Sequence, residues 1–497
     1  MSDYILKVEN IKKSFGGVKA LKGVNLEIKK AEIHCLAGEN GCGKSTLIKI
    51  ISGFYTADDG SVEFNGNKFE KITPSEAIDQ GVQVIYQDFS VFPNLTVMEN
   101  LALNMELMNK RKFVNYKRFR KIAEEAVAKI NFRVDLDEIV ENLSVADKQM
   151  IAICRALLND AKLIIMDEPT TALTKKEVRA LFDIIKSLQK LGIAILFVSH
   201  KLDEVFEISE RFTIMRNGEN VVTGRTDELD SKKFAFYMTG REFKEEYYEP
   251  ADANGTPVLE VNKLTLKNGF TDVSFKLKKG EILGITGLLG SGRNELLLSL
   301  FGIYPADSGE IKVAGRPVHI KSVKDAIKSG IGYVPADRLT EGLFLQQSIS
   351  RNTIISNIDK LSTRLGFLKG KEIENEVENW IQTLSIATND VERPVQTLSG
   401  GNQQKVVLAK WLATDLSVLV LNGPTVGVDI GSKYDIHAHI RSLVKKGLSV
   451  IMVSDDLPEI INNCNRVIIF RNGRILCEVN SKETNEKQLA EMATNVY

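Results

Sequence analysis

The chain has 497 residues, more than one compact core usually holds, so we expect two or more domains of ordinary size. Its 65 lysine and arginine residues balance 65 aspartate and glutamate residues. No net charge therefore favours nucleic acid or acidic lipid, and we expect no nucleic-acid partner. Hydrophobic residues make up 43% of the sequence, which is typical of a folded protein and excludes extended disorder.

The cysteines and the apolar segments bear on cellular location. Five cysteines without CxxC spacing predict a reducing cytoplasm and no disulfide framework or metal cluster. The first residues lack a basic region followed by an apolar core, and no segment approaches eighteen uninterrupted apolar residues. We expect any membrane association to occur through a partner.

The first chemical motif is a glycine-rich loop that begins at Gly38. It fits GxxxxGK[ST] and lies between an apolar strand, Ile33–Ala37, and a predicted helix, Thr46–Ser52. In such loops the backbone N–H groups and the helix N-terminus form a cradle for a polyphosphate. Lys44 is expected to reach the β and γ phosphates, and Ser45 to offer its hydroxyl to Mg²⁺. The predicted ATP-binding residues are Gly38, Glu39, Asn40, Gly41, Cys42, Gly43, Lys44, Ser45 and Thr46.

Two residues outside this loop carry weaker signals. Phe15 is predicted to stack on adenine, although a single aromatic residue is more often part of a core. Gln87 is predicted to bind Mg²⁺ and to sense the γ-phosphate, although a glutamine after a strand is by default a surface residue.

The sequence of residues from about 95 to 145 is typical of helices. It predicts a mostly helical subdomain inserted between the nucleotide-binding motifs.

Catalytic side chains follow two later strands. Leu163–Met166 is apolar and precedes Asp167 and Glu168, at the strand end where open α/β sheets bind ligands. Asp167 is predicted to hold Mg²⁺, and Glu168 to act as general base toward the attacking water. His200 follows the strand 193–198, a position suited to the γ-phosphate or the water, although alone it would be read as structural.

The sequence then repeats itself. Val24-Asn-Leu-Glu-Ile-Lys-Lys-Ala-Glu-Ile returns from Val273 at an offset of about 249, and later motifs return at an offset of about 255. A charged, Pro- and Gly-containing stretch separates the halves. We therefore predict a first domain at 1–241, a linker at 242–257 and a second domain at 258–497.

A further motif, the signature sequence, is Leu398-Ser399-Gly400-Gly401-Asn402-Gln403. The order of the phosphate loop, the signature, the strand-end carboxylates and the histidine resembles that of ABC transporter ATPases over nearly the whole chain. The second half has a GxxGxGR loop at 287–293, and the first half has an altered signature at 143–148. In these two features the chain resembles the ATP-binding proteins of ribose, galactose and xylose importers, and nucleoside and autoinducer importers share the pattern. The resemblance implies an α/β fold with two tandem P-loop ABC ATPase domains, each a mixed sheet core with a helical subdomain.

The resemblance also implies partners and composite sites. The partners are transmembrane permease subunits and, indirectly, an extracytoplasmic solute-binding protein, with the chain peripheral at the cytoplasmic face of the plasma membrane. Each ATP is expected between the phosphate loop of one domain and the signature of the other. The first composite site would join the first-domain residues to Ser399, Gly400 and Gly401.

The second composite site is predicted to be degenerate. Arg293 and Asn294 replace the loop lysine and serine, Asn422 and Gly423 replace the two carboxylates, and Asp455 replaces the histidine. On the first-domain side, Ser144-Val-Ala-Asp147 fits a helix capping box better than a signature. We therefore predict one competent ATP site.

Three other functions fit parts of the pattern less well. Soluble tandem ABC ATPases that act on ribosomes resemble this chain in having two fused domains, but they normally keep both sites intact and have a long helical linker. DNA-repair ABC proteins would carry coiled-coil or zinc-binding insertions, which the sequence lacks. A nucleotide-gated scaffold without hydrolysis is disfavoured by the intact Glu168.

Overall fold

The computed structural model describes residues 3–86, 91–108, 115–171, 173–242 and 255–494. Contacts within the chain divide it into two compact units, Met1–Phe243 and Lys244–Tyr497. Most of the predicted linker, 242–257, lies outside the described residues, and the first strand of the second unit begins at Pro257. Among the described residues no helix has both the length and the apolar character to cross a membrane.

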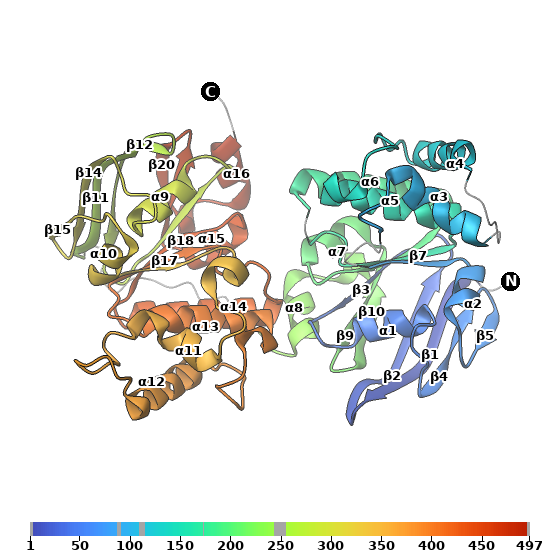
Figure 1. The fold of residues 1–497 in the computed structure, drawn as a ribbon, viewed down its shortest axis with the longest axis horizontal. Coiled ribbons are helices and arrows are strands. Elements are labelled where there is room, and N and C mark those ends of the chain that lie inside the picture. Colours follow the sequence, from blue (N-terminus) through green and yellow to red (C-terminus); the bar gives the residue numbers. More distant parts are fainter. Residues whose placement is uncertain (1–2, 87–90, 109–114, 172, 243–254, 495–497) are drawn as a thin grey trace. The chain divides into compact units, whose positions relative to one another are not determined.

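The first unit is built on two sheets. One is antiparallel, in the order β2-β1-β4-β5, and the other has the order β10-β9-β3-β8-β7-β6, parallel except for β10. Helix α1 packs on both β2 and β3, so the two sheets share one apolar core (Figure 1). The strands are β1 (Tyr4–Phe15), β2 (Val18–Lys29), β3 (Ile33–Gly38), β4 (Asp59–Phe64), β5 (Asn67–Phe69), β6 (Val82–Ile85), β7 (Leu163–Asp167), β8 (Ala194–Val198), β9 (Arg211–Arg216) and β10 (Glu219–Arg225).

The helices of the first unit include the predicted helical subdomain. In Figure 1, α3, α4 and α5 group together, and they pack on one another around their own apolar cluster. The segment 95–145 thus contains the predicted helices, although residues 130–139 between α4 and the short turn at 140–142 are not helical. The helices are α1 (Lys44–Ile51), α2 (Pro74–Asp79), α3 (Val97–Met108), α4 (Tyr116–Lys129), α5 (Val145–Leu158), α6 (Lys175–Lys190), α7 (Leu202–Ile208) and α8 (Ser231–Thr239).

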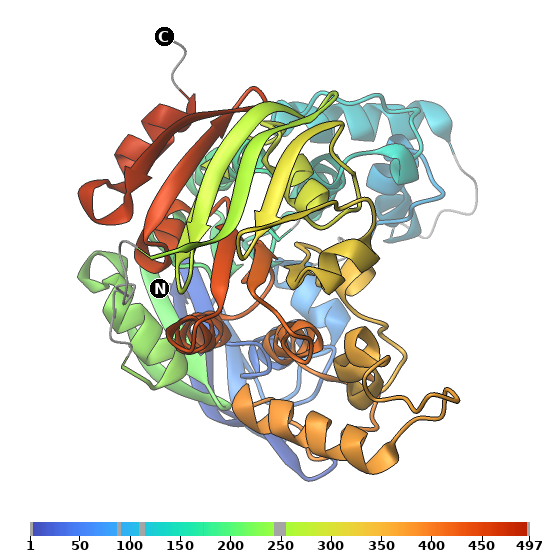
Figure 2. The same ribbon diagram turned by 90° about the vertical axis from the view of Figure 1, so that its left-hand side faces the viewer.

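The second unit repeats this plan with its own core. Its antiparallel sheet, β12-β11-β14-β15, curves beside the six-stranded sheet β16-β17-β18-β13-β19-β20 (Figure 2). The strands are β11 (Pro257–Leu266), β12 (Phe270–Lys278), β13 (Ile282–Gly287), β14 (Ser308–Val313), β15 (Arg316–Val318), β16 (Ile331–Val334), β17 (Val418–Asn422), β18 (Ser449–Val453), β19 (Arg466–Arg471) and β20 (Arg474–Asn480). The helices are α9 (Arg293–Leu300), α10 (Val323–Lys328), α11 (Ile349–Ile354), α12 (Gly370–Thr383), α13 (Gly400–Leu412), α14 (Ile430–Lys445), α15 (Leu457–Asn463) and α16 (Glu486–Thr494).

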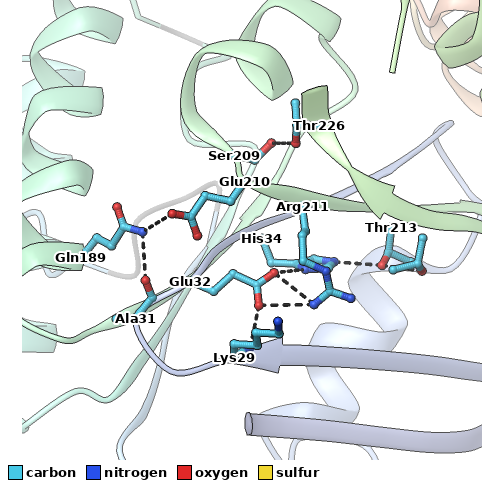
Figure 3. A network of polar contacts seen from close by, with 11 residues as sticks. Lys29, Ala31, Glu32, His34, Gln189, Ser209, Glu210, Arg211, Thr213 and Thr226 are labelled. Atoms are coloured by element: carbon cyan, nitrogen blue, oxygen red, sulfur yellow. Dashed lines mark hydrogen bonds and ion pairs between the residues drawn. The ribbon is translucent and has the colours of Figure 1, made fainter. Parts of the chain in front are cut away.

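A buried ion pair fixes the start of the central strand in each unit. Glu32, just before β3, accepts hydrogen bonds from Arg211 on β9 and from the backbone of Lys29, and the fully buried His34 lies 2.9 Å from the same carboxylate (Figure 3). Glu281 and Arg466 form the equivalent pair in the second unit. This network lies at the opposite end of β3 from the glycine-rich loop, so we assign it to holding the sheet together.

Candidate nucleotide-binding and catalytic site

The phosphate loop of the first unit connects β3 to α1. Gly41 and Gly43 have φ values of 82° and 109°, in the left-handed region that favours glycine. A Cβ atom at Gly43 would lie 2.8 Å from the carbonyl oxygen of Ala20, so β2 also requires a glycine there. The predicted ATP-binding residues are all in this segment: Gly38 ends β3, Glu39 to Gly43 form the loop, and Lys44, Ser45 and Thr46 form the first turn of α1.

Lys44 is buried beneath the loop. Its Nζ atom donates to the backbone carbonyls of Gly38 at 2.6 Å and Glu39 at 3.1 Å, and only 6% of the residue is exposed. The exposed Ser45 hydroxyl lies 3.5 Å from Oδ2 of Asp167. The loop therefore carries a fixed positive charge and places a hydroxyl beside a carboxylate.

The two carboxylates at the end of β7 have different electrostatic environments. Burial and the neighbouring Glu168 raise the pKa of Asp167. A hydrogen bond with His200 lowers the pKa of Glu168 although burial opposes this, and the charges of His200, Lys44 and Lys201 lower it further. Glu168 is therefore held as a carboxylate, whereas at Asp167 burial and the charge of Glu168 outweigh the stabilising charges of Lys44 and Lys49.

Glu168 and His200 meet across neighbouring strand ends. β3, β8 and β7 are adjacent and parallel, so their carboxyl ends lie at one edge of the sheet. Nδ1 of His200 lies 3.1 Å from Oε1 of Glu168. Glu168 has a φ of 48°, which is strained for a residue with a side chain and is often found at functional sites.

Two predicted residues remain less defined. Phe15, at the end of β1, is 41% exposed and contacts Tyr55 edge to face with the ring centroids 5.2 Å apart, so it does not belong to the core. Its stacking on adenine stays a prediction. Gln87 lies outside the described residues, and its role as an Mg²⁺ ligand and γ-phosphate sensor also stays a prediction.

The signature segment belongs to the second unit. Ser399 is the N-cap residue of α13, but its side chain makes no capping bond and instead accepts one from Asn402 at 2.9 Å. Glycines allow a ligand to approach the backbone closely, which is one reason to expect Gly400 and Gly401 in an ATP site. Packing within the unit also favours glycine at both positions, because a Cβ at Gly401 would lie 2.0 Å from the Ser432 hydroxyl and one at Gly400 would lie 2.9 Å from the backbone carbonyl oxygen of Gly427.

The corresponding segment of the first unit is capped differently. Ser144 is the N-cap residue of α5, and its hydroxyl accepts a bond from the backbone N–H of Asp147 at 3.1 Å. The Asp147 carboxylate accepts from the Ser144 hydroxyl, not from the backbone N–H of Ser144 as a full capping box would require. The side chain of Ser144 is thus engaged by its own helix.

The catalytic positions of the second unit carry different contacts. Arg293 donates to the carboxylate of Asp455, and Asn422 donates to the hydroxyl of Tyr333 at 3.3 Å. Gly423 has a φ of 57°, close to that of Glu168. The second unit has therefore kept the backbone conformation at this position and lost the carboxylate.

Sequence reasoning missed a buried glutamate that joins the two strand-end loops. In the first unit Glu204 accepts hydrogen bonds from Thr170 and Ser199, each at 2.5 Å. Glu459 does the same for Thr425 and Ser454 in the second unit. The signal was present in the repeat, because these three positions persist at the 255-residue offset where the catalytic residues do not.

The site in the first unit defines a P-loop nucleotide-binding protein: a glycine-rich loop lies between a strand and a helix, and acidic side chains lie at the carboxyl end of β7 in the same sheet. The ABC transporter family matches the sequence at residues 21–171 and 270–426. The chain belongs to this family, as one of its ATPases, and has two tandem ABC domains.

Similar proteins of known type match the chain over nearly its whole length. The ribose import ATP-binding protein RbsA of Oceanobacillus iheyensis is 40% identical, covering 98% of each chain. RbsA of Bacillus subtilis is 39% identical, covering 98% of this chain and 99% of its own. Among solved structures, a nucleotide-free ATP-binding cassette from an ABC transporter is 31% identical and covers 45% of this chain and 92% of its own, with a TM-score of 0.42.

Proposed function

We propose that this chain is the ATP-hydrolysing motor of an importer for a simple sugar, and that hydrolysis takes place on the phosphate loop of the first unit. The observation that carries the proposal is the contact between Glu168 and His200 beside that loop, at 3.1 Å. The names of the ribose import relatives support sugar as the cargo. A nucleoside-like solute is the nearest alternative cargo.

The residues of the first unit suit attack by water on the γ-phosphorus. Glu168, whose lowered pKa favours the carboxylate form, accepts a proton from the water as the oxygen attacks, while His200 orients the carboxylate. Lys44 places its charge where the β and γ phosphates bind. The bond from the γ-phosphorus to the bridging oxygen breaks, so that ADP and inorganic phosphate are the products.

Mg²⁺ fits the donor set of this loop. The Ser45 hydroxyl and Asp167 carboxylate supply the oxygen ligands that Mg²⁺ prefers, and a cation there would relieve the raised pKa of Asp167. When bound with ATP, the ion would offset the negative charge of the phosphates. Ser45, Asp167 and Gln87 are the proposed ligands.

The proposed second half of the competent site is the signature of the second unit. Ser399 leaves the N-terminus of α13 without a side-chain cap, so its backbone N–H groups are suited to a γ-phosphate. The proposed partners are transmembrane permease subunits, with an extracytoplasmic solute-binding protein reached through them. The proposed location is peripheral, on the cytoplasmic face of the plasma membrane.

The test is ATP turnover by the purified chain with and without its permease. E168Q is expected to bind ATP with normal affinity and to lose nearly all turnover, because the amide cannot accept the proton. E177Q, which alters the capping glutamate of α6, is the matched control and should keep turnover. Substantial hydrolysis by E168Q would contradict the general-base assignment.

A further inference from the structure

The second unit has kept the shape of a phosphate loop. Gly290 and Gly292 have φ values of 76° and 96°, close to those of the equivalent glycines of the first unit. Helix α9 begins at Arg293 as α1 begins at Lys44, and the two cations are buried to a similar degree, with 3% and 6% exposed. The loop has therefore not collapsed, although its chemistry differs.

The cation of this loop has a different kind of partner. Among the described residues, the hydrogen bonds of Lys44 go to neutral backbone carbonyls, whereas Arg293 forms an ion pair with the carboxylate of Asp455. Asp455 follows β18 by two residues, as His200 follows β8. Because the cation of a phosphate loop meets the β and γ phosphates, the Asp455 carboxylate holds the guanidinium that a polyphosphate would need.

We propose that Asp455 is a tethered anion that closes the second phosphate loop to nucleotides. A polyphosphate entering the loop must displace the carboxylate from Arg293 and then lie beside its negative charge, and both steps weaken binding. The ion pair of Arg293 and Asp455 therefore sets the affinity of this loop for nucleotides. The first loop has no such barrier, because a histidine stands at the corresponding position.

Unused donors show that the loop retains a capacity for anions. The Nε and Nη1 atoms of Arg293 and the hydroxyl of Ser291 are buried without a hydrogen-bond partner in the described part of the chain. Buried donors without partners are costly, and phosphate oxygens would satisfy them. Removal of the Asp455 charge should therefore convert the loop into a site for a nucleoside di- or triphosphate.

The test is equilibrium binding of ADP and ATP to the full chain, with K44A weakening the first loop in every variant. D455N and D455S should each bind nucleotide roughly tenfold tighter or better than the K44A parent. Adding R293A should abolish the gain. D415N removes an exposed carboxylate that pairs with Lys360 elsewhere in the second unit, and should leave binding unchanged.

Photo-crosslinking of an azido nucleotide, followed by peptide mapping, assigns the new site to residues 287–295. The proposal is overturned if the parent already labels this loop strongly, or if neither D455N nor D455S gains binding while both keep the melting temperature of the parent. Because the measurement does not need hydrolysis, its failure is distinct from failure of the proposed motor function, which ATP turnover tests with Lys44 intact.

Discussion

His200 and Glu168 lie 3.1 Å apart, from Nδ1 to Oε1, although 32 residues separate them in the sequence. Their hydrogen bond is the largest of the contributions that shift the pKa of Glu168, and it lowers this pKa. The imidazole therefore favours the ionised form of the carboxylate and also holds its orientation.

The first prediction concerns the pH dependence of hydrolysis. Because the pKa of Glu168 is lowered, turnover should persist on the acid side until the pH falls below the ordinary range of a glutamate. H200A removes the hydrogen bond, so the pKa of Glu168 should rise and the acid limb of the remaining activity should move to higher pH. Steady-state rates between about pH 3 and 8 test this, because that range extends below the ordinary glutamate pKa of about 4.3.

H200Q supplies the internal control for that experiment. Its amide can still donate to Oε1 of Glu168, so the acid limb should return toward that of the unchanged protein even if the rate remains low. If the acid limb of H200A lies at the same pH as that of the unchanged protein, His200 does not lower the pKa of Glu168.

The second prediction concerns the stability of the second unit. Burial would raise the pKa of Glu459, but hydrogen bonds and charges from His437, Lys433 and Ser454 outweigh it and lower the pKa from 4.5 to about 2. A lowered pKa in the folded state stabilises the fold at pH values above 4.5, and this contribution is lost as the pH falls toward about 2. A shift of this size corresponds to about 3 kcal/mol.

E459Q should therefore lower the free energy of unfolding by about 3 kcal/mol at neutral pH, and the difference should shrink as the pH falls below 4.5. Urea unfolding at several pH values measures this. E491Q, at an exposed position on α16, is the control and should change stability little. A deficit for E459Q that is constant with pH would show that shape, not charge, explains it.

The third prediction compares two serines at equivalent signature positions. S399R is expected to abolish hydrolysis, because a bulky side chain would enter the proposed competent interface. S144R should leave basal turnover largely intact and cost the capping bond of α5, about 1 kcal/mol. Equal loss of activity in both variants, at matched melting temperatures, would mean that the second composite site is needed too.

The fourth prediction concerns restoration of the lost carboxylates. N422D/G423E should not produce hydrolysis in a K44A background, because Arg293 and Asn294 remain in the loop. Gly423 has a φ of 57°, and a Cβ there would lie 2.8 Å from Val426, so the glutamate should also destabilise the unit by about 1–3 kcal/mol. ATP turnover and melting temperature measure the two effects, and measurable turnover would contradict the prediction.

The fifth prediction tests why the signature needs glycine at position 401. G401A should destabilise the second unit, because the added methyl group would meet Ser432 on α14. S432G removes that obstacle, so the double variant should recover more stability than the sum of the single changes predicts. A nucleotide-only reason for Gly401 would leave stability unchanged in G401A and lower turnover alone.

The sequence by itself determined the fold class and the phosphate loop. Apolar strands and the GxxxxGKS motif are patterns of residues close together in the sequence, and the tandem repeat is visible by comparing the two halves. The loop at Gly38–Ser45 forms where it was predicted. The replacement of Lys44, Glu168 and His200 in the second half was equally visible, because aligned repeats reveal substitutions directly.

Only the tertiary structure decided what those substitutions do. The pairing of Arg293 with Asp455 joins residues 162 positions apart, and the hydrogen bonds of Glu204 join the ends of two neighbouring strands. The packing of Gly401 against Ser432 was likewise hidden in the sequence. Such contacts depend on how parallel strands and helices are placed side by side, so residue types and spacing along the chain do not specify them.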